Sequence, residues 1–432
     1  MYSKKVIDFL SRKKIKEFDL VKINQNGLTL EGLLLPRSDS GDEDCIVIKL
    51  ASGYNAGIRF DSSLEIEKTG EKKFLQPKAF KPARNKSLPK IVLIATGGTI
   101  ASRVDYETGG VKALETPEEL LSRFPALTEC VDVVKVVSPF TVMSEDITSD
   151  EWVSLAETIE KELPHCDGVV ITHGTDFLSY TATALAFLLP NLQKPVLLVG
   201  AQRSPDRASF DGALNLQCAA HFVNSGFKGV AVVMHATSND DYCFVHKPTK
   251  VRKMHSSRRD AFRSINDSPI ARVYANGKTE LLQAFFEPKN FSSKKKFGKV
   301  FLLKAFPNSD PKIIDLLVEN KVKGIIIEAG ALGHVPTNGK LSWIPHIEKA
   351  IKSGVFVGVT SQCFYGRVSN SVYSNLRKLA KTGAVFLGDA LSEAMLVKLS
   401  WALEQGINLD ELMLDNLTGE FNDRLTQELF LN

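Results

Sequence analysis

Short apolar segments alternate with helix-length segments from residue 91 onward, and this alternation constrains the fold more than any other feature. Near-continuous apolar runs are typical of strands that are covered on both faces, as in a parallel sheet with helices on either side. The pattern therefore predicts a larger α/β domain over residues 90–286, with strands at 91–95, 131–137, 168–172, 196–200 and 229–234.

Helix start signals fall between these strands. Residues 116–119 and 148–151 each place a threonine three positions before a glutamate, the spacing at which the carboxylate reaches back to the cap amide. After a lysine-containing linker at 287–298 the alternation resumes on a smaller scale. It predicts a second, smaller α/β domain over residues 299–432, with strands at 300–304, 324–328, 355–360 and 384–387.

The first 75 residues have a different pattern, with short strands and turns. Asn26-Gly27 separates two strand-like runs and suits a tight hairpin, because both residues tolerate positive φ. We therefore predict a small β-barrel-like domain over residues 1–75, followed by a linker at 76–89 that is rich in proline and lysine. Its expected strands are 19–24, 28–35, 45–50, 58–60 and 64–67.

Composition excludes several classes of protein. The six cysteines lie far apart without a C-x-x-C pair, and the eight histidines form no cluster, so we expect neither a disulfide framework nor a metal site. No run approaches the roughly 20 apolar residues of a membrane span, and we expect a cytoplasmic protein. A net charge of +4 permits nucleic acid as a partner without requiring it.

Two predicted strands are followed by small hydroxyl residues and glycines. Residues 96–99, Thr-Gly-Gly-Thr, follow the first strand, and residues 172–176, Thr-His-Gly-Thr-Asp, follow the third. In parallel sheets active groups gather at the carboxyl ends of strands, so both motifs are candidates for a catalytic site. The alternatives are a glycine-rich turn for the first motif and ordinary helix capping by Thr175 or Asp176 for the second. His173 is interpreted as a structural loop residue.

A third candidate is the basic stretch at residues 246–263, which holds several lysines and arginines. A solvated positive face is the simplest interpretation of such a stretch. Contact with a phosphate backbone is a second interpretation, and a lysine directed into the catalytic site is a third.

Motif order now reveals a resemblance. Residues 96–99, 172–176 and 199–203, followed by Asp211-Gly212, resemble those of the two-domain bacterial-type L-asparaginases over about residues 90–425. The whole chain is more similar still to the D subunit of archaeal glutamyl-tRNA(Gln) amidotransferases, which places a small β domain before the asparaginase unit. The resemblance implies an L-asparaginase-like pair of α/β domains with parallel sheets, preceded by a small all-β barrel-like domain. The segments that carry this closer similarity are 32–37, 48–50, 53–55, 252–263, 361–368 and 395–401.

The resemblance also implies a set of catalytic residues. Thr99 would be the first nucleophile, with Thr175, Asp176 and Lys253 as a second cluster and Tyr106 assisting from a mobile loop. A threonine hydroxyl needs a neighbouring base, and a partly desolvated lysine can serve as one.

Substrate-holding residues follow from the same resemblance. Ser144 and Glu145 fall where the asparaginases carry the Ser-Gln-Asp that holds the substrate's α-carboxylate and amine. Glu145 departs from that pattern, which leaves the preference between glutamine and asparagine open. Backbone N–H groups at Gly98 and Gly174 are candidate donors to the tetrahedral intermediate.

The function implied is amide hydrolysis that supplies ammonia to a partner. That partner would be an E-type subunit that binds glutamate-charged tRNA(Gln) and activates it with ATP and magnesium, so that no cofactor is expected in this chain. A homodimer of this chain within the larger complex is expected. The alternatives are a free-standing asparaginase or glutaminase, and an asparaginase-fold binding protein without turnover.

Overall fold

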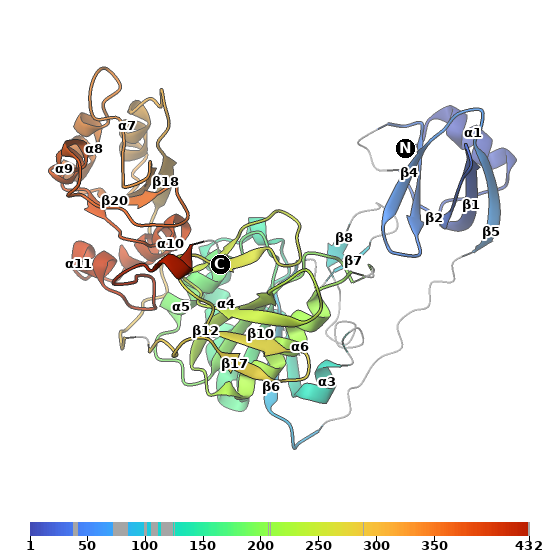
Figure 1. Ribbon diagram of the computed structural model, residues 1–432, viewed down its shortest axis with the longest axis horizontal. Helices are drawn as coiled ribbons and strands as arrows, with labels where there is room; N and C mark the ends of the chain where they lie inside the picture. Colours follow the sequence, from blue (N-terminus) through green and yellow to red (C-terminus); the bar gives the residue numbers. More distant parts are fainter. Residues whose placement is uncertain are drawn as a thin grey trace.

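The computed structural model describes residues 1–37, 42–71, 85–98, 102–104, 111–113, 124, 126–205, 207, 209–287 and 289–430. Its three main sheets have five strands near the N-terminus, eight in the middle of the chain and four towards the C-terminus. These sheets lie in separate bodies, which are blue, mostly green to yellow, and orange to red in Figure 1. The predicted fold class, an α/β pair after a β region, is confirmed.

The N-terminal sheet is antiparallel throughout, in the order β4-β3-β2-β1-β5. The hairpin predicted at Asn26-Gly27 is confirmed, because these residues have φ of 49° and 81° and Gln25 faces Leu28 across them. The fourth strand begins earlier than predicted, since Asn55 already pairs with the third strand. The strands are β1 (Asp19–Gln25), β2 (Leu28–Leu34), β3 (Cys45–Leu50), β4 (Asn55–Arg59) and β5 (Glu65–Glu71).

A helix that the sequence patterns did not predict, α1 (Lys4–Arg12), precedes this sheet. Ser3 accepts a hydrogen bond from the Val6 amide at the start of the helix. Val6 and Leu10, one turn apart, are buried in the core of the small domain. Two apolar anchors in a lysine-rich segment are a weak helical signal, and packing against the sheet stabilises a helix too short to form alone.

The central sheet has the order β17-β16-β13-β12-β11-β10-β6-β9. The five strands predicted from apolar runs are confirmed within a residue or so, and they are parallel. They are β6 (Lys90–Ala95), β9 (Asp132–Val137), β10 (Gly168–Thr172), β11 (Pro195–Val199) and β12 (Gly229–His235). Three antiparallel strands that were not predicted extend one edge, namely β13 (Tyr242–His246), β16 (Ala271–Tyr274) and β17 (Thr279–Leu281).

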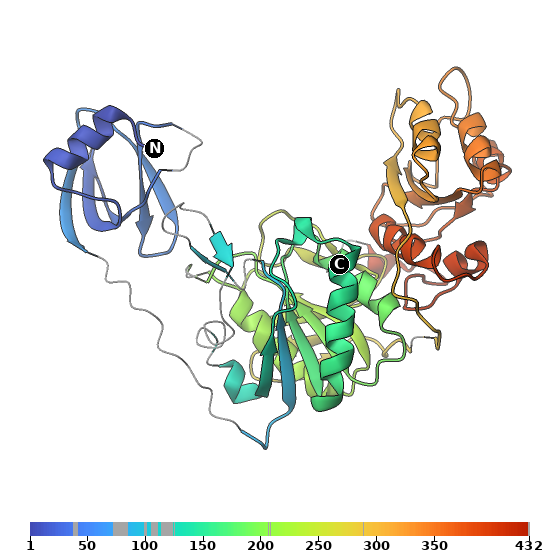
Figure 2. The ribbon, with the colours of Figure 1, turned by 180° about the vertical axis from the view of Figure 1, so that it is seen from behind.

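Helices cover both faces of the central sheet (Figure 2). Helices α4 and α5 share one core cluster with Val169 and Ile171, whereas α3 and α6 share the other with Val170. Successive strand residues point to opposite faces, which is why the two cores alternate along β10. Thr148 and Glu151 form the predicted capping box, whereas residues 116–119 lie outside the described residues. The helices are α3 (Leu127–Cys130), α4 (Ser149–Glu162), α5 (Leu178–Leu188) and α6 (Gly212–Phe222).

The C-terminal sheet is parallel, in the order β18-β19-β20-β21. All four strands lie where the sequence predicts them. They are β18 (Val300–Lys304), β19 (Gly324–Ala329), β20 (Phe356–Ser361) and β21 (Val385–Phe386). The helices of this domain are α7 (Lys312–Glu319), α8 (Ile344–Lys352), α9 (Ser374–Ala380), α10 (Ser392–Ala402) and α11 (Leu409–Leu414).

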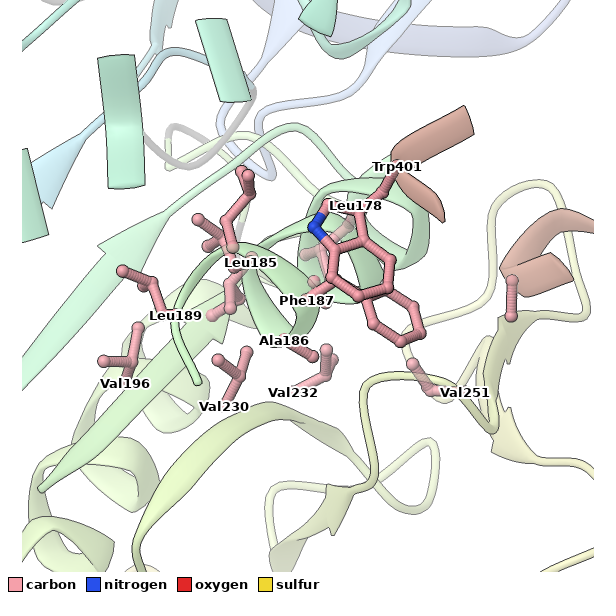
Figure 3. Packing of buried hydrophobic residues seen from close by; sticks show 14 of the residues in the cluster. Leu178, Leu185, Ala186, Phe187, Leu189, Val196, Val230, Val232, Val251 and Trp401 are labelled. Carbon is pink, nitrogen blue, oxygen red and sulfur yellow. The ribbon is translucent and has the colours of Figure 1, made fainter. Parts of the chain in front are cut away.

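Helices α5 and α10 join the two α/β domains. Trp401 on α10 stacks on Phe187 of α5, with ring centroids 5.2 Å apart and an interplanar angle of 22° (Figure 3). The core cluster around them contains buried residues of both sheets, including Val169 and Ile326. A continuous apolar core therefore fixes the two domains to each other.

Tyr54 of the small domain touches the loop that follows β11. Its hydroxyl lies 2.8 Å from the Ser209 hydroxyl, and the Arg207 guanidinium lies over its ring at 4.7 Å. The small domain thus contacts the segment that follows the carboxyl end of β11 in the central sheet.

Candidate active site

The carboxyl ends of β6, β10 and β11 lie side by side on one edge of the central sheet. In the parallel register Ala95 faces Thr172, and Thr172 faces Val199. Backbone hydrogen bonds continue beyond the strands, because Thr96 N–H donates to the Thr172 carbonyl at 3.1 Å and His173 N–H donates to the Val199 carbonyl at 2.9 Å. Both predicted motifs therefore meet where parallel sheets carry their ligand sites.

Glycines allow the backbones of these segments to touch. A β-carbon on Gly98 would lie 2.5 Å from the Gly174 Cα, and one on Gly174 would lie 2.8 Å from the Ser144 Cβ. A β-carbon on Gly200 would likewise lie 2.6 Å from the Thr175 methyl group. Larger residues would force the segments apart, so the close assembly of the site depends on these three glycines.

Lys253 joins the second motif from a distant part of the chain. Its Nζ donates to the Thr175 Oγ1 at 3.0 Å and to the Asp176 Oδ1 at 2.6 Å. The capping interpretation is not supported, because α5 begins at Leu178 with Phe177 as its cap residue and without a side-chain cap bond. The lysine side chain is 13% exposed and the aspartate side chain 62% exposed, so the cluster opens to solvent on the carboxylate side.

A short two-stranded hairpin presents Lys253. Strands β14 (Val251–Lys253) and β15 (Phe262–Ser264) pair antiparallel, with Lys253 opposite Phe262. Val251, on the same face of the strand as Lys253, is buried in the core that α5 shares. This packing places the lysine over the start of α5, beside the end of β10.

Ser144 lies against this assembly from the side of β9. It begins the short 3-10 helix Ser144–Asp146 and is 4% exposed. Its hydroxyl donates to the Glu145 carboxylate at 3.4 Å, and Glu145 itself is exposed. The Val142 amide just before them donates to the Thr96 carbonyl at 3.1 Å. Four of the predicted site positions, Gly98, Gly174, Ser144 and Thr175, are thus brought into contact.

Thr99 and Tyr106 lie outside the described residues, so their roles stay predictions. Gly98, the last described residue before Thr99, has φ of 80° and follows Gly97, which has φ of 114°. A β-carbon on Gly97 would lie 2.3 Å from the Val142 carbonyl oxygen. The chain therefore turns sharply just before Thr99, directly against the segments that hold the rest of the site.

His173 is completely buried beside the site. Its Nδ1 lies 2.7 Å from the Gly174 carbonyl oxygen. Burial lowers the pKa of His173 to about 4, with the hydrogen bond to Gly174 opposing the shift. The ring is therefore neutral near pH 7, which agrees with the structural role expected from the sequence.

The basic stretch at 246–263 is not a run of unpaired cations. All seven of its lysines and arginines form ion pairs with carboxylates within 4 Å. One of them, Lys253, enters the site, as the third interpretation of this stretch anticipated. The pairs are Lys247–Asp267, Lys250–Asp389, Arg252–Glu393, Lys253–Asp176, Arg258–Asp260, Arg259–Asp240 and Arg263–Asp260.

A buried polar support behind the site was not predicted. Asp211 accepts hydrogen bonds from the Gln202 and Arg203 amides and so holds the loop after β11. Burial raises the pKa of Asp211, although these amides oppose the shift. Nearby, the Asn215 amide donates to the Gly200 carbonyl at 2.9 Å. The sequence motif Asp211-Gly212 could be recognised, but the hydrogen-bond partners of Asp211 follow only from the folded structure.

The described part of the chain holds no group of three His, Cys, Asp or Glu side chains placed to bind a metal ion. Within the same residues no helix is both long and apolar enough to cross a membrane. The groups that converge at the strand ends are instead hydroxyls, a carboxylate, an amine and backbone amides. Such groups suit nucleophilic chemistry on a carbonyl compound.

Comparison with known families assigns all three domains. The sequence matches the family described as Asparaginase, N-terminal, over residues 90–285. It matches the Glutaminase/Asparaginase C-terminal domain over residues 299–413 and the GatD N-terminal domain over residues 15–68.

Solved structures agree with this placement. The thermostable L-asparaginase from Thermococcus kodakarensis has a TM-score of 0.69 at 27% identity, over 78% of this chain and 100% of its own. A probable cytoplasmic L-asparaginase from Campylobacter jejuni has a TM-score of 0.65 at 27% identity, over 76% of this chain and 99% of its own.

Full-length relatives carry a more specific name. The D subunit of the glutamyl-tRNA(Gln) amidotransferase from Pyrococcus abyssi is 44% identical, over 96% of this chain and 97% of its own. That from Pyrococcus furiosus is 43% identical, over 99% of this chain and 100% of its own. With its asparaginase-type domains and the preceding β domain, the chain belongs to the family of glutamyl-tRNA(Gln) amidotransferase D subunits.

Proposed function

We propose that this chain releases ammonia from the side-chain amide of glutamine, with Thr99 as nucleophile, for an amidotransferase that converts Glu-tRNA(Gln) to Gln-tRNA(Gln). The contact of Lys253 with Thr175 and Asp176 at the end of β10 is the observation that carries the proposal. It supplies an amine next to a hydroxyl at the edge of the sheet where Gly98 leads into Thr99.

In the first half of the proposed reaction, the Thr99 hydroxyl attacks the amide carbon and its proton passes to the amide nitrogen. Backbone N–H groups at Gly98 and Gly174 are candidate donors to the oxyanion, and one such donor contributes about 3–4 kcal/mol in a known protease. The C–N bond then breaks, ammonia leaves, and a glutamyl ester of Thr99 remains.

In the second half, water attacks this ester and the C–O bond to Thr99 breaks, which releases glutamate. Thr175 and Lys253 relay a proton from that water to the Thr99 oxygen, which leaves as a hydroxyl group. Asp176 orients the lysine through the 2.6 Å contact. Ser144 and Glu145 hold the α-groups of the substrate, and Tyr106 assists Thr99.

The partner in this proposal is an E-type subunit that activates glutamate-charged tRNA(Gln) with ATP and magnesium. The chain itself needs no cofactor for amide hydrolysis, and it forms a homodimer within the larger complex. The relatives' name supports membership in a tRNA-dependent amidotransferase.

A free-standing asparaginase or glutaminase is the second candidate function, and the L-asparaginase neighbours favour it. Those neighbours cover 76–78% of this chain, whereas the D subunits cover nearly all of it. The N-terminal β domain is the part that distinguishes the two groups, because residues 15–68 match the GatD N-terminal domain.

Measuring ammonia release separates these functions. The purified chain is given L-glutamine or L-asparagine, alone and together with the E-type subunit, ATP and Glu-tRNA(Gln). We expect glutamine hydrolysis that increases in the full mixture, together with Gln-tRNA(Gln) formation. Equal hydrolysis with and without the other components, and no amidated tRNA, would favour the free-standing enzyme. No hydrolysis in any mixture would contradict both.

A further inference from the structure

The residue before Lys253 reaches into the other α/β domain. Arg252 Nη1 donates to Glu393 Oε2 at 2.6 Å, and Glu393 lies in the first turn of α10. The Arg252 guanidinium also lies over the Phe364 ring, 4.4 Å from its centroid. Arg252 is therefore held by two contacts to the C-terminal domain. The two hydrogen bonds of Lys253 described above, to Thr175 and Asp176, are both to the central domain.

Strand geometry explains this division. Successive side chains of a strand point to opposite faces, so Arg252 and Lys253 leave β14 in opposite directions. Val251 and Lys253 share the face towards α5, and Arg252 occupies the face towards α10. The three-residue strand β14 thus lies between the two domains, with one charged side chain directed to each.

The base of the same hairpin is anchored to the C-terminal domain as well. Lys250 and Asp389 form an ion pair at 2.6 Å, and both side chains are fully buried. Asn266 donates to the carbonyls of Asp389 at 2.9 Å and Gly366 at 3.0 Å. Residues 250 and 266 flank the two strands, so the base is fixed before the chain reaches Lys253.

Arg252 is the anchor nearest to Lys253 on this hairpin. Its partner Glu393 is 5% exposed, and burial raises the pKa of Glu393 while Arg252 opposes the shift. A buried carboxylate retains its charge only when it is paired. The ion pair therefore holds the Arg252 guanidinium and the Glu393 carboxylate in one geometry. The ladder of β14 and β15 has only three residue pairs and cannot by itself hold the strand along its length.

We infer that the Arg252–Glu393 pair is a positioning device, through which helix α10 of the C-terminal domain sets the place of Lys253 against Thr175. The inference rests on the proposed catalytic role of Lys253. Loss of the pair lets β14 shift between its anchors, and the amine leaves hydrogen-bond distance of the Thr175 hydroxyl. Substrate-holding residues such as Ser144 lie on another segment and keep their places.

The test compares Glu393→Gln with a matched control, Glu420→Gln, which breaks a second buried ion pair made by helix α10. Lys398 of α10 pairs with Glu420 at 2.5 Å, both side chains are fully buried, and neither is part of the catalytic hairpin. Both substitutions remove one buried carboxylate, so both lower the melting temperature. Ammonia release from L-glutamine is measured in the complete complex with partner, ATP and Glu-tRNA(Gln).

We expect kcat of Glu393→Gln to fall on the order of 100-fold, the effect of a displacement of about 1 Å at a reacting group, with KM changed less than about threefold. Glu420→Gln should keep kcat within about threefold of the wild type, because it moves no catalytic group. Arg252→Lys, which keeps the charge, should retain more activity than Arg252→Met. This second pair of variants provides the test if Glu393→Gln fails to fold.

Equal kcat values for Glu393→Gln and Glu420→Gln would overturn the inference, as would a loss confined to KM. Equal activity of Arg252→Lys and Arg252→Met would also overturn it. Failure of the proposed function has a different signature, because the wild-type complex would then release no ammonia from glutamine.

Discussion

The contact between Gly98 and Gly174 leads to a sharp prediction for the substitution Gly98→Ala. The new β-carbon would lie 2.5 Å from both Cα and N of Gly174, and 3.0 Å from the His173 carbonyl carbon. Ordinary contact begins near 3.4 Å, so the two backbones must part by roughly 1 Å. Alanine at the φ of 80° adds a strain of about 1–2 kcal/mol.

Gly226→Ala isolates that strain from the collision. Gly226 has the same φ of 80°, and a β-carbon there would meet nothing within 4 Å. We expect Gly226→Ala to lose about 1–2 kcal/mol of unfolding free energy. Its ammonia release should stay at the wild-type rate. Gly98→Ala should lose a further 1–3 kcal/mol, roughly the cost of overpacking, and its ammonia release should fall on the order of 100-fold because Thr175 follows Gly174 directly.

Denaturant unfolding and ammonia release from glutamine measure the two effects on the same samples. Both variants are compared with the wild type under identical conditions, the activity in the complete complex. If Gly98→Ala lost no more stability than Gly226→Ala and kept its activity, the glycine contact would not hold the site together.

Three further predictions follow from the site and the small domain. Thr175→Val and Lys253→Met should each severely reduce ammonia release, and the double variant should lose little more activity than either single variant. If the activity loss of the double variant equalled the product of the two single losses, the two residues would act independently. The pKa of His173 is about 4 when folded and 6.5 otherwise, so the unfolded chain binds more protons between these values and stability falls as the pH falls below 6.5. His173 should therefore lower the free energy of unfolding by about 2 kcal/mol between pH 7 and about pH 5. In His173→Gln the free energy of unfolding should depend less on pH over this range. Deleting residues 1–80 should leave an α/β unit that folds and binds substrate but associates weakly with the partner, so undiminished complex in size-exclusion chromatography would deny the small domain a docking role.

The sequence predicts much of the framework because strands buried on both faces leave an unmistakable pattern. Every parallel strand from β6 to β12 follows from an apolar run, and the Asn26-Gly27 hairpin follows from turn chemistry. Antiparallel strands β13 and β16 were not predicted, since both are short and mix polar with apolar residues. Helix α1 was not predicted from the sequence, because tertiary packing rather than helix propensity stabilises it.

The site could be predicted only in part from local patterns. The strand-end motifs indicate Gly98, Gly174 and Thr175, but Lys253 lies 78 residues from Thr175 in the sequence, and spacing alone left three interpretations of its basic stretch. The tertiary structure decides between them, because Lys250, Arg252 and Lys253 each meet a carboxylate in a distant part of the chain. The pairing of Arg252 with Glu393 across the two domains has no local sequence signal at all.

Rescue of Thr99→Val by free ammonium tests the central claim most directly. The variant is assembled with the E-type subunit, ATP and Glu-tRNA(Gln), and Gln-tRNA(Gln) formation is measured with glutamine or with ammonium chloride as nitrogen donor. Valine replaces the hydroxyl by a methyl group of similar size, so the chain should fold and assemble. We predict amidation with ammonium at the wild-type rate and none with glutamine. Amidation of the tRNA from glutamine at a near wild-type rate would contradict a threonine nucleophile at this position.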